Sequence, residues 1–390
     1  MKEYIVKTKG IIDGTGAGLL PNGEMIVRDG KIAAVGTSLK AEGLPVVDLS
    51  GYYLLPGLVD SHTHLSIVPA QGNQLAQMAL PAGRNILRSM PNIRRQLESG
   101  VTTMRIMGEE HWIDLDIRNA IDEGLIEGPR IFAGGIGIVA TNGHGVGLTT
   151  SDTPYEVRKN IRKNFAKGAD FVKMFMTGGM SSSRPPVDFC GFSREEVAAA
   201  VEEATRMRTY VAAHAHGGPG VDLCIEEGVR TIEHGALLTD EQIKRMCDKQ
   251  MWVVGTFSIM FHPTGIEQSD FSNPAIKAKV LHNREVEAET FSRILASGLR
   301  YAIGTDSMHG LISYEMECLV NFGASNMDAI VAATRSGAEI CMMEDRVGTL
   351  EAGKLADFIA VKENPLDDIK AMAQVDLVYK DGVKLVDKRA

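Results

Sequence analysis

Two histidines separated by one residue are the first side chains in this sequence with an evident capacity for chemistry. His62 and His64 lie in the segment PGLVDSHTH, residues 56–64, directly after a short apolar run. Side chains two residues apart in a β-strand point to the same face, so both imidazoles could bind one metal ion. A surface strand also produces such a pair by chance, but the position at the end of an apolar strand favours metal binding.

A lysine inside an apolar run is the second candidate. Lys173 is the central residue of FVKMF, residues 171–175. Burial disfavours the ammonium form and lowers the pKa of a lysine, and a neutral amine can take up CO2 to become a carbamate. The two oxygens of a carbamate can bridge two metal ions. The alternative is a lysine that extends from the strand end into solvent.

Two more histidines and an aspartate each end a later apolar run. His214 lies in VAAHAHG, His234 in TIEHG and Asp306 in AIGTDS. Taken singly, each has an ordinary explanation, such as a structural histidine or an aspartate that caps the next helix. Repeated placement at strand ends along one chain is much harder to attribute to chance.

Short apolar runs that alternate with helix-like stretches must position these side chains. Two of the helices are marked by capping boxes, Ser193 with Glu196 and Thr239 with Gln242. The alternation predicts an α/β fold, a (β/α)8 TIM-like barrel over residues 56–346, in which the carboxyl ends of the strands meet at one mouth. A doubly wound sheet is the alternative, but the GxGxxG turn expected early in such a sheet is missing. The eight runs are residues 58–59, 101–106, 131–132, 171–175, 210–213, 231–232, 252–254 and 301–303.

The two ends of the chain differ from this middle and resemble each other. Asp29-Gly30 and Asp381-Gly382 are each flanked by strand-like segments, a pattern typical of two-residue β-hairpins. Short hairpins cannot bury an apolar face alone. We therefore expect residues 1–55 and 347–390 to pair into one small β-domain.

Composition excludes several classes of function. Lys and Arg number 41 against 50 Asp and Glu, a net charge of −9, which provides no positive field for nucleic acid or anionic lipid. The five cysteines contain no CxxC pair and indicate reduced thiols rather than disulfides or a thiolate zinc site. The first residues, MKEYIVKTKG, carry no apolar export segment. We expect a cytoplasmic protein with a small-molecule substrate and with no nucleic-acid or membrane partner; a homo-oligomer is left open.

Together these motifs resemble the amidohydrolase superfamily, specifically its imidazolonepropionase-like and Xaa-Pro dipeptidase (prolidase)-like branch. The resemblance implies a metal-dependent hydrolase whose barrel is flanked by a β-sandwich. It rests on PGLVDSHTHL, FVKMF, VAAHAHG, TIEHG, GTDS and the closing GTLEAGKLADFIAV, residues 348–361.

The resemblance also implies a role for each candidate ligand. His62 and His64 would bind the more buried metal together with Asp306, and carbamylated Lys173 would bridge the two ions. The second ion would be bound by His214 and His234. Imidazole and carboxylate ligands without thiolate suit Zn²⁺, with Mn²⁺, Fe²⁺ or Co²⁺ as alternatives.

Substrate contacts follow from the same resemblance. His144, in TNGHG, would polarise the carbonyl or hold the substrate, and His216 would lie beside the ligands and the substrate. Arg105 or Arg184 could pair with a substrate carboxylate.

The expected reaction is hydrolysis of an amide C–N bond by a metal-bridging hydroxide, with Asp306 carrying the proton to the leaving nitrogen. The substrate expected is a dipeptide of the Xaa-Pro type or an N-acyl amino acid, and the alternative is a cyclic amide. A mononuclear deaminase is less favoured because no glutamate follows His214 in HAHGG. A non-catalytic scaffold is disfavoured because all six ligand positions are filled.

Overall fold

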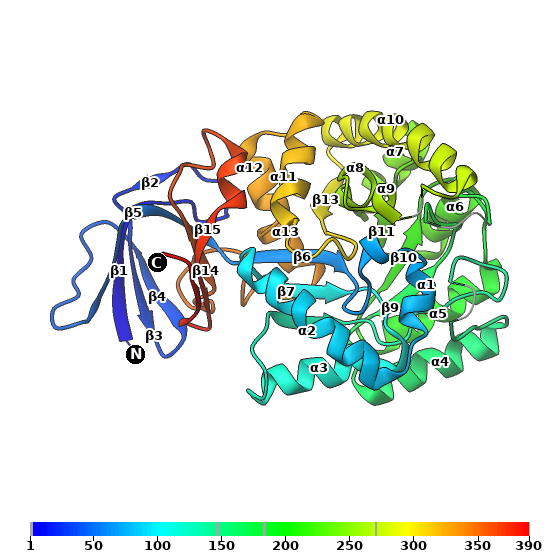
Figure 1. The fold of residues 1–390 in the computed structure, drawn as a ribbon, viewed down its shortest axis with the longest axis horizontal. Helices are drawn as coiled ribbons and strands as arrows, with labels where there is room; N and C mark the ends of the chain where they lie inside the picture. The colour runs from blue at the N-terminus through cyan, green and yellow to red at the C-terminus, as the bar shows by residue number, and fades with distance from the viewer. Residues whose placement is uncertain (1–2, 146–147, 182–184, 270, 390) are drawn as a thin grey trace.

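The computed structural model describes residues 3–145, 148–181, 185–269 and 271–389. In this part of the chain the strands form three sheets, one built from the chain ends and two from the middle. The sheet of the chain ends lies at one end of the molecule, together with both termini, and the other two sheets lie among helices at the opposite end (Figure 1).

Residues from both ends of the chain share the first sheet. Its strands are β1 (Glu3–Ile11), β2 (Leu20–Pro21), β3 (Glu24–Arg28), β4 (Lys31–Gly36), β5 (Val46–Pro56), β14 (Phe358–Val361), β15 (Val375–Lys380) and β16 (Val383–Asp387). Strand β5 pairs parallel with β1 and antiparallel with β14, which joins the two ends. Both predicted hairpins are confirmed, and Asp29, Gly30, Asp381 and Gly382 all have positive φ as a two-residue turn requires.

This sheet folds over onto itself. Tyr4 on β1 and Tyr379 on β15 have ring centroids 6.5 Å apart although β5 and β14 lie between them in the sheet. The Tyr4 hydroxyl also donates to the carbonyl of Gly382 at 2.7 Å. One continuous sheet therefore encloses its own small core.

Eight parallel strands form the other two sheets. The first contains β6 (Leu58–Thr63), β7 (Val101–Ile106) and β8 (Arg130–Ala133); the second contains β9 (Val172–Phe175), β10 (Val211–Ala215), β11 (Thr231–His234), β12 (Trp252–Gly255) and β13 (Arg300–Ile303). Neighbours in each sheet are neighbours in sequence, and all of these pairings are parallel. Each strand coincides with one of the predicted apolar runs, since strands covered on both faces need side chains that tolerate burial on both.

The two parallel sheets meet at both of their open edges. The backbone N–H of Asp306, which follows β13, donates to the carbonyl of His62 on β6 at 2.8 Å. On the other side, Ile138 donates to the carbonyl of Lys173 on β9 at 2.8 Å, and Phe175 donates back to Ile138 at 2.9 Å. Side chains at the strand ends of both sheets can therefore face a common space.

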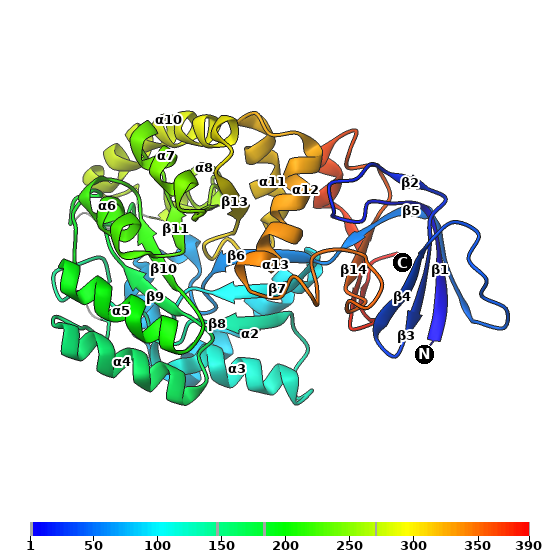
Figure 2. The same ribbon diagram turned by 180° about the vertical axis from the view of Figure 1, so that it is seen from behind.

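Helices cover the outside of the parallel strands (Figures 1 and 2). The longer ones are α2 (Ala82–Glu98), α3 (Ile113–Asp122), α4 (Pro154–Lys167), α5 (Arg194–Arg206), α6 (Gly218–Glu227), α7 (Asp240–Asp248), α10 (Pro274–Ser297), α11 (Ile312–Asn321), α12 (Asn326–Ala332) and α13 (Arg335–Ile340). Short helices α1 (Gln74–Met78), α8 (Ser258–Phe261) and α9 (Ile266–Ser269) and the 3-10 segments η1 (Pro69–Gln71), η2 (Glu110–Trp112) and η3 (Ile369–Ala373) complete the described elements. The capping boxes predicted at Ser193 and Thr239 are both present. No helix in the described ranges combines the length and apolarity needed to cross a bilayer.

Candidate metal centre

A cavity lies at the carboxyl ends of the parallel strands. The cavity is partly open to solvent. All six candidate metal ligands line it, and so do the two additional histidines expected near the substrate. These eight residues are His62, His64, His144, Lys173, His214, His216, His234 and Asp306.

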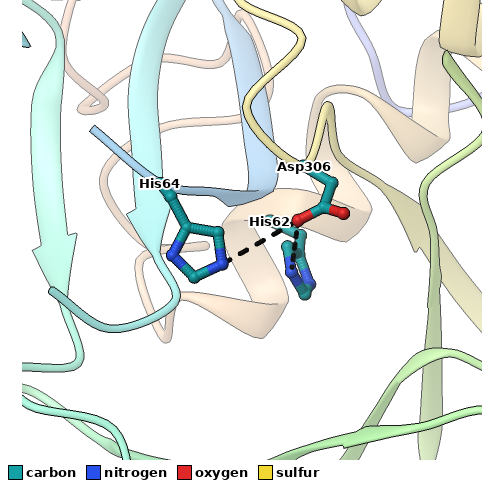
Figure 3. Close-up of side chains that lie close together, drawn as sticks. All are labelled: His62, His64 and Asp306. Carbon is teal, nitrogen blue, oxygen red and sulfur yellow. Dashed lines mark ion pairs between the residues drawn. The ribbon is translucent and has the colours of Figure 1, made fainter. Parts of the chain in front are cut away.

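His62, His64 and Asp306 form the tightest group in this cavity. Oδ1 of Asp306 lies 3.4 Å from Nε2 of His62 and 3.8 Å from Nε2 of His64 (Figure 3). One ligand atom from each residue lies within 4.8 Å of the other two, a spacing that one metal ion could span. Asp306 reaches this position from a left-handed backbone turn, with φ of 43°, directly after β13.

Each of the four histidines predicted to bind metal has one ring nitrogen already engaged by the protein. Nδ1 of His62 lies 2.8 Å from the Glu233 carboxylate, and Nδ1 of His64 lies 2.9 Å from the carbonyl of Gly108. The corresponding partners are the Gly178 carbonyl for Nε2 of His214, at 3.1 Å, and the Thr256 hydroxyl for Nδ1 of His234, at 2.7 Å. Metal-binding histidines typically show this arrangement, because the held nitrogen fixes the ring while the other nitrogen keeps its lone pair.

Lys173 is buried among these groups. Its side chain is 1% exposed, and its Nζ makes no hydrogen bond with any described residue. The Nζ lies 4.6 Å from the centre of the Phe175 ring. Burial lowers the pKa of Lys173 to about 8, despite the opposing charges of Glu233 and Asp306. Carbamate formation requires the neutral amine, and the lowered pKa increases the neutral fraction of Lys173.

Four of the histidine rings that line the cavity pack against one another. The centroids of His214 and His234 are 4.6 Å apart, those of His144 and His214 are 4.7 Å apart, and those of His216 and His234 are 5.0 Å apart. Burial, followed by the other nearby histidines, holds the pKa of His214 and of His234 well below the usual value. Neutral imidazoles are the form that can bind a metal. Together with the orphaned Nε2 of His62, the donor set fits divalent metal ions.

Glu233 is a site residue that sequence reasoning missed. It lies on β11 beside His234 and is fully buried. Its Oε2 accepts from His62 and also from Nη2 of Arg105, at 2.6 Å. Burial alone would raise the pKa of Glu233, but Arg105 and His62 lower it to about 2. The signal available in the sequence was a carboxylate inside the apolar run TIEHG.

The structure corrects the expectation for Arg105. This side chain is fully buried on β7 and does not line the cavity. Its guanidinium donates to the carbonyl of Ser61 and to Glu233. It therefore supports the residues beneath the cavity and has no free face for a substrate carboxylate. Arg184 lies outside the described residues.

The comparison with known proteins agrees with this geometry. Residues 53–385 match the amidohydrolase family. The chain belongs to the amidohydrolase family. Members of this family are hydrolases that act on carbon–nitrogen bonds and generally depend on metal ions, so hydrolysis of an amide bond is the chemistry to expect of this amidohydrolase.

Individual relatives differ in what they act on. Ochratoxinase from Aspergillus niger is 28% identical over 370 residues, which cover 84% of this chain and 75% of the relative. An imidazolonepropionase from Fusobacterium nucleatum is 23% identical over 94% of this chain and 92% of its own. A crystal structure of a Xaa-Pro dipeptidase with methionine bound in the active site superposes with a TM-score of 0.91 at 29% identity, covering 98% of this amidohydrolase and all of that chain.

Proposed function

We propose that this amidohydrolase binds two divalent metal ions and hydrolyses the amide C–N bond of a dipeptide of the Xaa-Pro type or of an N-acyl amino acid. The observation that carries the proposal is the set of four histidines, each held by one ring nitrogen, around the buried and unpartnered Lys173. The likeness to a Xaa-Pro dipeptidase supports the substrate class.

The proposed ligands divide into two sets that share one bridge. His62, His64 and Asp306 would hold one ion, and His214 and His234 would hold the other. Carbamylated Lys173 would bridge them, and Zn²⁺ suits these ligands best. When bound, such ions polarise a carbonyl oxygen and lower the pKa of water.

Two side chains of the protein would handle the proton and the carbonyl. Asp306 would accept a proton from the attacking water and pass it to the leaving nitrogen, since its carboxylate is held ionised by His62. Burial lowers the pKa of His144 to about 4, so the ring is neutral at pH 7 and can donate one N–H to the substrate carbonyl. His216 would support the second set of ligands through its stacked contact with His234.

We also propose that the two parallel sheets form one (β/α)8 barrel over residues 56–346, with residues 1–55 and 347–390 as a separate β-domain. The hydrogen bonds at both edges of the parallel sheets support this arrangement. It would bring the strand ends that carry the site into one mouth.

A cyclic amide is the second candidate substrate. Imidazolonepropionase relatives match nearly the whole chain, which favours this alternative. The two candidates differ in whether the scissile bond lies in a ring. Hydrolysis of cyclic amides alone would contradict the peptide proposal.

The test combines metal analysis with a substrate panel. We expect purified protein to contain about two ions per chain and to lose activity on a dipeptide panel after chelation, with recovery on addition of Zn²⁺. Lys173→Ala should lower the metal content and reduce kcat/KM at least about 1,000-fold, because the bridge is lost. Full activity without metal, or an unchanged metal content in Lys173→Ala, would contradict the binuclear centre.

A further inference from the structure

Glu287 is a buried carboxylate in the cavity that the mechanism does not use. It lies on α10, is 1% exposed, and lines the cavity together with the candidate ligands. Its Oε2 accepts no hydrogen bond from any described residue. Because a buried carboxylate oxygen without a donor is costly, such a group indicates a partner that arrives with a ligand.

The neighbours of Glu287 do not supply that partner. No ion pair joins it to a described lysine or arginine, and the nearby Arg284 donates instead to the Met260 carbonyl at 2.6 Å and to Glu267 at 2.9 Å. Burial, followed by the negative charge of Glu315, raises the pKa of Glu287 well above its usual value. The positive charge of Arg284 opposes this shift without cancelling it.

The second carboxylate of this region is already satisfied. Glu315 accepts from the backbone N–H groups of Phe257 and Ser258, at 2.6 and 2.8 Å, and from the Ser258 hydroxyl. It does not line the cavity. Glu287 is thus the carboxylate of this pair that a ligand can reach.

Apolar side chains also line the cavity that contains Glu287. Met78, Ile259, Met260 and Ile266 line the same cavity. A wall of this kind excludes water and strengthens the attraction between a carboxylate and a cation. A neutral apolar group placed there would leave the carboxylate without a partner.

We propose that Glu287 binds the free α-ammonium group of the substrate and so selects unacylated dipeptides over N-acyl amino acids. This rests on the proposed function. In a dipeptide the α-nitrogen is attached to the carbon next to the scissile carbonyl, so it must lie close to the reacting centre. Glu287 and Asp306 line the same cavity, so an ammonium group next to the scissile carbonyl could lie within reach of the Glu287 carboxylate.

The test compares two substrates that differ only in the amino group, alanyl-proline and propionyl-proline. The wild-type enzyme should favour alanyl-proline in kcat/KM by about 100-fold or more, because a site built for a hydrogen-bonding group rejects the analogue that lacks it. Glu287→Gln should lose most of the activity on alanyl-proline and change that on propionyl-proline less than about threefold. Glu287→Asp should recover part of the loss. Glu289→Gln, which removes an exposed glutamate of the same helix that does not line the cavity, is the matched control and should leave both substrates unaffected.

Binding measured without turnover gives an independent result. By calorimetry the metal-loaded enzyme should bind L-methionine more tightly than N-acetyl-L-methionine, and Glu287→Gln should remove the difference. Equal wild-type rates on the two proline substrates, or an equal loss on both in Glu287→Gln, would overturn the role of Glu287 while leaving amide hydrolysis intact. If neither substrate is hydrolysed, the proposed function fails, and equal calorimetric affinities would then overturn the α-ammonium site as well.

Discussion

At the scale of single residues, the candidate metal centre depends on hydrogen bonds that fix each imidazole ring through one of its two nitrogens. Arg105 donates to Glu233, and Glu233 in turn accepts from His62. Arg105 and Glu233 are both fully buried. The orientation of the His62 ring, a candidate metal ligand, is therefore set by charged groups that a substrate never touches.

Replacement of Glu233 by glutamine tests this support. The amide keeps the shape of the side chain but weakens the acceptor for His62 and leaves the Arg105 charge without its counterion. We expect metal affinity to fall about 10- to 100-fold, measured by competition with a chelator, together with a lower free energy of unfolding.

The surface variant Glu339→Gln is the control for that experiment. It removes the ion pair of Glu339 with Arg300, which lies away from the cavity, and should leave metal affinity unchanged. Wild-type metal affinity in Glu233→Gln would contradict a positioning role for the carboxylate, whatever happens to stability.

At the scale of elements, the site depends on how closely neighbouring strands approach. Gly304 follows β13 and faces His62 on β6, where an added Cβ would lie 2.3 Å from the backbone nitrogen of His62. No side chain fits at that distance without moving one strand. A glycine is therefore required where the two parallel sheets meet.

Gly304→Ala should displace His62 and lower both metal content and the free energy of unfolding, the latter by about 1–3 kcal/mol as for other overpacked sites. Metal analysis and urea unfolding would measure the two effects. Gly83→Ala is the matched control, because a Cβ at Gly83 in α2 meets no atom within 4 Å. Retention of both metal ions in Gly304→Ala would show that the strands can separate without loss of the site.

The capping box at the start of α7 should affect the stability of the protein but not the cavity. The Thr239 hydroxyl accepts from the backbone N–H of Gln242 at 3.2 Å, and the Gln242 side chain accepts from the N–H of Thr239 at 3.1 Å. Thr239→Ala should therefore cost about 1 kcal/mol in urea unfolding and leave metal content unchanged. Thr239→Ser keeps the hydroxyl and should restore most of the loss; equal destabilisation by both changes would argue against the cap.

At the scale of the whole molecule, one arginine joins the parallel strands to the sheet of the chain ends. Arg130 begins β8, and its guanidinium donates to Asp357 at 2.7 Å and to Asp381 at 2.8 Å. Asp357 directly precedes β14, and Asp381 lies in the turn between β15 and β16. The last strands of the chain are thereby fixed against the strands that carry the site.

Removal of this arginine should uncouple the two parts. Arg130→Met leaves the buried Asp357 without its counterion, so we expect a loss of about 3 kcal/mol or more in the free energy of unfolding. The double variant Arg130→Met with Asp357→Asn should recover a large part of that loss, whereas Arg94→Met, which breaks an exposed pair with Glu98, should cost less than about 1 kcal/mol. Additive losses in the double variant would contradict the coupling.

The sequence by itself determined most of the elements and the positions of the candidate metal ligands at the strand ends. Apolar runs mark buried strands because each strand is covered on both faces, and a ligand such as His62 or Asp306 is recognisable because it ends such a run. The Asp-Gly hairpins and the capping boxes are equally local, since their hydrogen bonds join residues a few positions apart.

Only the tertiary structure decided which polar groups hold those ligands and which remain free for a substrate. Arg105 and Glu233 are 128 residues apart in sequence, and no local pattern shows that an arginine will be buried by a carboxylate from another strand. Glu287 lies in the middle of a long helix and reaches the cavity because α10 packs over the strand ends. Burial of a charge depends on the whole surrounding surface, which exists only after the strands and helices have come together.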